Sequence, residues 1–159
     1  HKNTKMKTYV LMVSTKFPAG NIKHGKPTGF IEKIKAEAKI HTIRQNFPLW
    51  KNRFVEIEAG EAVLSVRVWA GKPYRSKQIE VFTFDSTDGI GVQGLYFDSN
   101  NLLESFVSHE DSESKYQTYI SPVQLAINDG LNFAEFQNWF KGCDLNEPMA
   151  IIHFTKFRY

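Results

Sequence analysis

Apolar and polar residues alternate along several short segments of this chain, a pattern typical of strands with one buried face. The clearest segment is 62–69, in which Leu64, Val66 and Val68 share one side. Five further strands are expected at residues 9–13, 39–44, 79–84, 90–97 and 149–157. The turn at residues 71–73 is expected to connect two of them.

Helical spacing of apolar residues predicts a short helix from Phe30 to Ala38, with its lysines outside. Ser121 followed by Pro122 predicts the start of a second helix, because serine caps the free N–H groups and proline suits the first turn. Gly130 is expected to end it.

Asn132 and Glu135 have the spacing of a capping box and predict a third helix over 132–140. Its aromatic stripe is assigned to the core, namely Phe133, Phe136, Trp139 and Phe140. Residues 47–50 are predicted to be an irregular aromatic segment. Residues 108–115, which are polar and mostly acidic, are predicted to be a surface loop.

The order of these elements predicts a single domain over residues 9–159, preceded by a flexible segment at 1–8. We find no internal repeat, linker or low-complexity stretch. The strands are too short and too interrupted for a doubly wound sheet. We therefore expect an α+β fold, a small and mostly antiparallel β-barrel flanked by helices.

Composition places the chain among globular proteins of ordinary size. It has 159 residues, of which 42% are hydrophobic and 23% charged, and its net charge of +3 permits a nucleic-acid partner without demanding one. Cys143 is the single cysteine, so no intrachain disulfide can form, and a reducing, cytoplasmic location is expected. No apolar run could span a bilayer and no signal-peptide pattern opens the chain, so no membrane partner is expected.

Several kinds of chemistry lack their residue patterns. The five histidines show no metal-ligand spacing and Cys143 has no partner cysteine, so neither a metal nor another cofactor is expected. The glycines at 89–94 do not match a dinucleotide-binding loop and precede no helix. No nucleophile elbow supports a serine triad.

One group of candidate site residues lies in the run 39–44, where Lys39, Thr42 and Arg44 place an amine, a hydroxyl and a guanidinium within six residues. In a strand, Thr42 and Arg44 share a side, while His41 and Ile43 take the other. Lys39 could meet the hydroxyl only if the chain bends between helix and strand. The alternative is that both cations are solvated and the threonine is simply a good strand former.

A second group combines rings and cations at the ends of elements: Trp50, Arg67, Trp69, Lys72, Tyr74 and Arg75. Bases stack on aromatic faces and phosphates pair with lysine or arginine, so this composition suits nucleic acid. The alternative is that the tryptophans pack inward and the cations face solvent.

The signature Lys39-x-x-Thr42-x-Arg44 after a helix resembles that of ASCH domains, a family with a PUA-like β-barrel. The strand at 62–69 and the segment 126–131 before the last helix agree with it, and the resemblance extends from about residue 9 to 157. The sequences of segments 39–50 and 71–78 are similar to those of a bacterial branch of the family.

The resemblance implies two functions. Some ASCH and PUA-like domains bind RNA or read modified bases, which implies an RNA or nucleoside ligand at a cleft lined by Lys39, Thr42, Arg44 and Asp129. Small bacterial members are metal-independent amidohydrolases that deacylate N4-acetylcytidine-type nucleosides.

The hydrolase alternative implies Thr42 as nucleophile and Lys39 as base, with a pKa lowered by burial or by Arg44. Asp129 stands where that subgroup has glutamate, which withdraws the carboxylate by about one C–C bond; a displacement of about 1 Å can cost about 100-fold in rate. Arg44 is then either a structural clamp or a phosphate contact.

Overall fold

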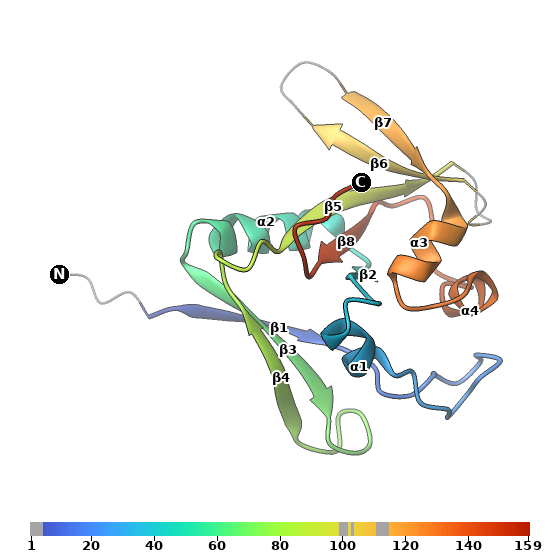
Figure 1. The fold of residues 1–159 in the computed structure, drawn as a ribbon, viewed down its shortest axis with the longest axis horizontal. Helices are drawn as coiled ribbons and strands as arrows, with labels where there is room; N and C mark the ends of the chain where they lie inside the picture. Colours follow the sequence, from blue (N-terminus) through green and yellow to red (C-terminus); the bar gives the residue numbers. More distant parts are fainter. Residues whose placement is uncertain (1–4, 99–101, 103, 111–114) are drawn as a thin grey trace.

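In the computed structural model, residues 5–98, 102, 104–110 and 115–159 are described. Their strands and helices follow in the order β1 (Lys7–Met12), α1 (Phe30–Lys35), β2 (His41–Arg44), α2 (Phe47–Glu58), β3 (Ala62–Trp69), β4 (Gln78–Phe84), β5 (Gly91–Phe97), β6 (Ser105–Glu110), β7 (Lys115–Ile120), α3 (Pro122–Asn128), α4 (Phe133–Trp139) and β8 (Met149–His153). The expected α+β class is confirmed (Figure 1).

The described strands form two sheets, in the orders β1-β3-β4 and β2-β8-β5-β6-β7. Neighbours are antiparallel except β1 and β3, which are parallel. The expectation of one continuous sheet or closed barrel is therefore wrong for the described strands. The edge strands are β1 and β4 in the smaller sheet and β2 and β7 in the larger one, and among the described residues no ladder of hydrogen bonds joins an edge of one sheet to an edge of the other.

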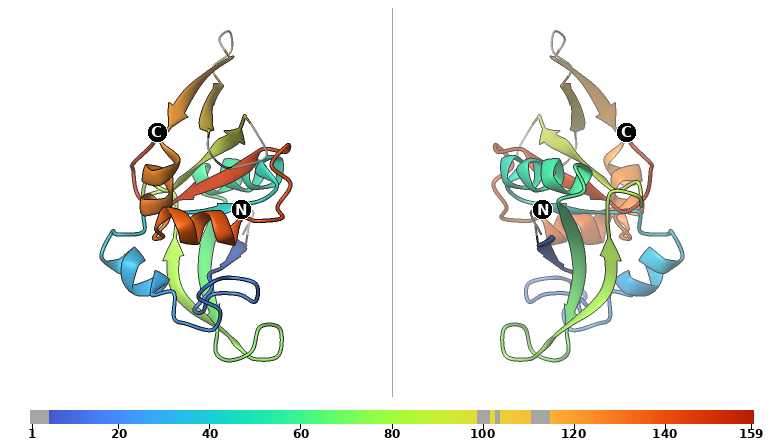
Figure 2. Two further views of the ribbon diagram at one scale, coloured as in Figure 1. Left: turned by 90° about the vertical axis from the view of Figure 1, so that its right-hand side faces the viewer. Right: turned by 90° about the vertical axis from the view of Figure 1, so that its left-hand side faces the viewer.

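The two sheets share one hydrophobic core, to which buried side chains from both contribute. Figure 2 shows β8 running across the direction of β3 and β4. Helix α2 contacts β3 of the smaller sheet and β5 and β8 of the larger one, so it bridges them. The alternation predicted for 62–69 is confirmed, since Leu64, Val66 and Val68 are all buried.

Helix α2 corrects the prediction that residues 47–50 are irregular. The Asn46 side chain caps the helix by accepting a hydrogen bond from the Leu49 N–H at 3.2 Å, and Pro48 lies in the first turn, where its missing N–H costs nothing. The helix buries three residues at helical spacing: Trp50, Phe54 and Ile57.

Both C-terminal helices begin as predicted. Ser121 caps α3, and Gly130 follows its end with φ of +82°, a backbone conformation that suits glycine. Asn132 and Glu135 form the expected capping box of α4. Helix α1 is shorter than predicted, because it ends at Lys35 and Ala38 is exposed.

Some boundaries differ from the prediction. β1 begins at Lys7, inside the segment expected to be flexible. Of the predicted loop at 108–115, residues 108–110 belong to β6 and Lys115 to β7, while 111–114 lie outside the described residues. β8 ends at His153, and the segment 154–159 turns back over the larger sheet, where the Tyr159 N–H donates to Gln93 at 3.0 Å.

Candidate functional site

The run 39–44 lies between α1, the end of α3 and the C-terminal segment. The Ile40 N–H donates to the Asn128 carbonyl at 2.9 Å, and the Ile40 carbonyl accepts from the Phe154 N–H at 2.9 Å. A Cβ at Gly130 would lie 3.1 Å from the Lys39 Cβ, tighter than nearly all real contacts. Glycine at this position therefore lets the end of α3 approach Lys39.

Lys39 and Asp129 meet in the interior, ninety residues apart in sequence. The Lys39 Nζ donates to the Asp129 carbonyl at 2.7 Å and to its Oδ1 at 3.3 Å. The ammonium also lies 4.3 Å from the centre of the Phe30 ring. Only 1% of the Lys39 side chain and 5% of the Asp129 side chain are exposed. The aspartate is therefore long enough to reach the lysine, contrary to the concern that its carboxylate would be withdrawn.

Burial lowers the pKa of Lys39 from 10.5 to about 8. That pKa includes an opposing effect of the Asp129 carboxylate, which raises it, and a smaller contribution from the positive charge of Arg44, which lowers it. The amine is thus neutral in a substantial fraction of molecules at mildly alkaline pH. Both causes that the hydrolase alternative implies, burial and Arg44, therefore act on Lys39 in the expected direction.

Arg44 orients Thr42 and ties β2 to β1. Its guanidinium donates to the Thr42 Oγ1 at 2.7 Å, to the Ile43 carbonyl at 2.9 Å and to the Met12 carbonyl at 2.6 Å. Within the described part of the chain, no hydrogen bond joins the Lys39 amine to the Thr42 hydroxyl. The hydroxyl is therefore held by the guanidinium and not by the Lys39 amine.

His41 and Tyr159 belong to the same buried cluster, and the sequence reasoning missed both. The His41 Nδ1 lies 3.1 Å from the Asp129 Oδ1, and its Nε2 lies 2.6 Å from the Tyr159 hydroxyl. The Asn128 side chain donates to that hydroxyl at 2.9 Å. Burial lowers the pKa of His41, which favours the neutral ring. The partners then assign its proton to Nδ1, which donates to Asp129, while Nε2 accepts from Tyr159.

Lys39, Thr42 and Asp129 line one small cavity, as predicted, together with Phe30 and Arg44. Its volume is about 20 Å³, enough for about one water molecule. A ligand therefore cannot enter this inner cavity whole, and any ligand must reach it from outside.

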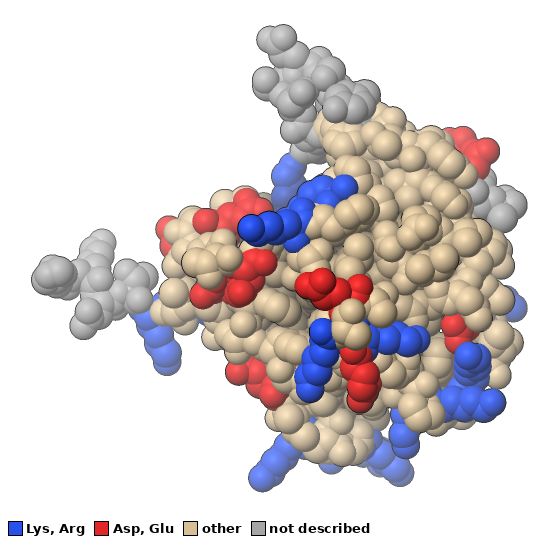
Figure 3. Space-filling model, in the orientation of Figure 1, with Lys and Arg blue, Asp and Glu red and all other residues tan. Residues whose placement is uncertain are grey.

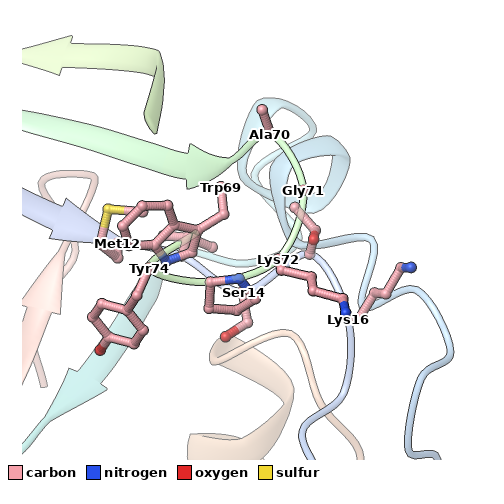
Figure 4. A pocket seen from close by; sticks show the side chains of 11 residues that line it. Met12, Ser14, Lys16, Trp69, Ala70, Gly71, Lys72 and Tyr74 are labelled. Atoms are coloured by element: carbon pink, nitrogen blue, oxygen red, sulfur yellow. The ribbon is translucent and has the colours of Figure 1, made fainter. Parts of the chain in front are cut away.

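Two larger recesses adjoin the inner cavity. One, of about 650 Å³, lies between the end of β1 and the turn after β3, and is lined by Trp69 and Tyr74 (Figure 4). The other, of about 460 Å³, is lined by Trp50 and Trp139. Ser14 lines all three spaces, so they lie next to one another around this residue, although Lys39, Thr42, Arg44 and Asp129 do not line the 650 Å³ recess. We call the three spaces together the cleft, and the polar cluster around the smallest of them its base.

The predicted set of rings and cations divides in the structure. Trp69 and Tyr74 lie together, with ring centres 5.2 Å apart and planes tilted by 49°, and Lys72 lines the same recess. Arg75 is exposed but does not line it. Trp50 is buried in the core, although an edge of it reaches the second recess.

Arg67 lies outside the cleft. Its side chain donates to the Ser65 hydroxyl at 2.9 Å and to the Gln78 amide oxygen at 3.0 Å on the smaller sheet. Arg67 is therefore held on the face of this sheet, and the prediction that it joins the ring platform is not supported by its position.

Among the described residues, no group of three or more histidine, cysteine, aspartate or glutamate side chains could hold a metal ion. In the same residues, every helix is too short or too polar to cross a bilayer. Comparison of the chain with models of protein families, with curated proteins and with solved structures found no match.

Proposed function

We propose that this protein is a cytoplasmic domain of the ASCH type that binds a modified nucleoside, free or within RNA, in the cleft above Lys39, Thr42, Arg44 and Asp129. The two sheets around one core would then be an opened form of the PUA-like barrel. The order of elements and the position of the Lys-x-x-Thr-x-Arg run support this assignment.

The observation that carries the proposal is the 650 Å³ recess, which has a pair of rings in its wall and shares Ser14 with the small cavity of the buried polar cluster. Its volume lies within the range of about 300–1,000 Å³ that is common for small-ligand sites. A base can stack on the Trp69–Tyr74 pair, because aromatic faces receive any base. Its polar edge, or a small substituent on it, would then face Ser14, which the recess shares with the inner cavity.

Calorimetric titration with N4-acetylcytidine and with a short RNA that contains it tests this proposal. Trp69→Ala is expected to lower the affinity about 10-fold, since stacking contributes about 1–3 kcal/mol per base. Tyr119→Ala, which removes an exposed ring on β7, is the matched control and should bind like the parent. Equal binding by the parent and Trp69→Ala, or no binding at low salt, would contradict the proposal.

A second function, hydrolysis of N-acyl nucleosides, is favoured by the convergence of Lys39, Thr42 and Asp129 on one cavity. In this reaction the Thr42 Oγ1 would attack the amide carbonyl while neutral Lys39 takes the hydroxyl proton. The same proton would pass to the leaving amine as the C–N bond breaks. Water would then release the acyl group from Thr42, with Asp129 holding Lys39 in place.

Release of acetate from N4-acetylcytidine tests this second function. Lys39→Ala should abolish it, Thr42→Val should remove it, and Thr42→Ser should keep part of it because a hydroxyl remains. The rate should rise as pH increases through about 8, since the base must be unprotonated. A Lys39→Ala protein as active as the parent would overturn the mechanism.

For the variant Asp129→Glu, the family pattern and this structure predict opposite changes in turnover. The residue would match the glutamate of the hydrolase subgroup, and the family pattern alone predicts faster turnover. Here the aspartate already contacts Lys39 and His41 in a cavity with room for about one water. We therefore expect the longer side chain to lower turnover, because it must displace packed groups.

A further inference from the structure

The recess beside Trp69 and Tyr74 has an aromatic end and a cationic end. Figure 4 shows the two rings on one side of it and the side chains of Lys72 and Lys16 on the other. The two lysines come from different parts of the chain, one from the segment after β1 and one from the turn after β3. Lys16 was not singled out by the sequence pattern.

Within the described part of the chain, neither lysine forms an ion pair. Among the residues that the structure describes, no carboxylate lies within 4.0 Å of the Lys16 or Lys72 ammonium, and the residues lining this recess include no aspartate or glutamate. Figure 3 shows lysine and arginine side chains along the lower edge of the molecule, the edge at which Figure 1 places the turn between β3 and β4. The positive potential of the rim is therefore available to an anion.

The turn that carries Lys72 and Tyr74 is fixed before any ligand binds. The Ser76 hydroxyl donates to the Lys72 carbonyl at 2.8 Å and accepts from the Gly71 N–H at 2.9 Å. Tyr74 has φ of +64°, a left-handed conformation that is unfavourable for a residue with a side chain, and its side chain is 90% exposed. Such strain around an exposed ring is typical of ligand sites.

We infer that the ligand of this recess carries a phosphate group, held by Lys16 and Lys72 while its base stacks on the Trp69–Tyr74 pair. The inference rests on the proposed nucleoside site and names its ligand class, a nucleoside 5′-phosphate or the phosphodiester of RNA. The ring centres are only 5.2 Å apart, so the base lies against the pair and not between its members. Sugar and phosphate then extend toward the lysines.

Titration of the protein with N4-acetylcytidine, its 5′-monophosphate and a single-stranded RNA containing it tests the inference. At low salt we expect the monophosphate to bind about 10-fold tighter than the nucleoside, with the difference shrinking as salt increases. The double variant Lys16→Gln, Lys72→Gln should lose this difference, because neutral amides replace both ammonium groups that hold the phosphate. Lys35→Gln, which removes an exposed charge from α1, is the control and should keep it.

The outcomes separate the inference from the proposed function. Equal affinity for nucleoside and monophosphate, or a double variant that keeps the difference, overturns the inference and leaves the nucleoside site standing. Failure of all three probes to bind overturns both. Tightest binding by the RNA assigns the phosphate to a polymer, and tightest binding by the monophosphate assigns it to a free nucleotide.

Discussion

The base and the rim of the cleft differ in how their charges are balanced. At the base, Lys39 and Asp129 are almost fully buried and bound to each other, and His41 is tied to both Asp129 and Tyr159. At the rim, the Lys72 ammonium has no carboxylate partner among the described residues.

This difference indicates which charged residues stabilise the fold and which are available to bind a ligand. A buried ion pair loses its hydration, and breaking it leaves an uncompensated charge inside the protein. An exposed residue can be replaced with little effect on stability. The base should therefore dominate stability, while the rim should dominate ligand affinity.

The largest loss of stability is expected from Asp129→Ala. It leaves the Lys39 ammonium buried without its carboxylate, so the free energy of unfolding should fall by about 3–5 kcal/mol. Urea denaturation at pH 7 measures it. At the rim, Lys72→Ala should change stability by no more than about 0.5 kcal/mol. Similar losses from both variants would remove the distinction between the two regions.

The next largest effect is a pH dependence of the free energy of unfolding, which comes from Lys39 at the bottom of the cleft. Because burial lowers the pKa of Lys39 from 10.5 to about 8, the unfolded chain holds a proton between these values that the folded protein has released. The free energy of unfolding should therefore rise from pH 8 to pH 10.5, by on the order of 3 kcal/mol, since one pKa unit corresponds to about 1.4 kcal/mol.

Other groups also titrate in this range, so the contribution is isolated by comparison with Lys39→Met. Burial raises the pKa of Tyr159, for example, which opposes the Lys39 contribution at the upper end. The difference between parent and variant stability should rise across this range as the parent gains stability. A difference that is flat with pH would show that Lys39 titrates near its ordinary value.

A smaller effect on stability, and one of opposite sign to that of Asp129→Ala, is expected from Tyr74→Gly at the rim. Glycine adopts φ of +64° without strain, so the variant should be as stable as the parent or more stable by up to about 1 kcal/mol. Ligand affinity should fall, because the exposed ring is lost. A marked loss of stability would show that this ring supports the turn and does not merely extend from it.

The sequence predicted the fold where local signals and packing agree. The capping box of Asn132 and Glu135, the serine cap of α3 and the alternation of β3 all appear as expected. Helix α2 was missed because Pro48 and the neighbouring rings resemble a loop when Asn46 is not recognised as the cap. The division into two sheets could not be predicted, because it depends on which distant strands share edges.

The candidate site was predicted only in part, because some of its residues are brought together by the tertiary structure alone. The run 39–44 identified Lys39 and Thr42, and the resemblance added Asp129, which the structure brings to the same cavity. His41 was not among the candidate site residues, and strand alternation places it on the face opposite Thr42. That face is also covered, by the end of α3 and by Tyr159, and only the tertiary structure shows this.

The parallel pairing of β1 with β3 has a consequence for how fast the protein folds. β3 and β4 are joined by the short turn at residues 70–77 and can pair early, because closing a short loop costs little entropy. β1 reaches β3 only across α1, β2 and α2, and β2 belongs to the other sheet. β1 can dock only after those elements are placed, so the recess between the end of β1 and the turn after β3 forms late. Folding should therefore be slow for a chain of this size.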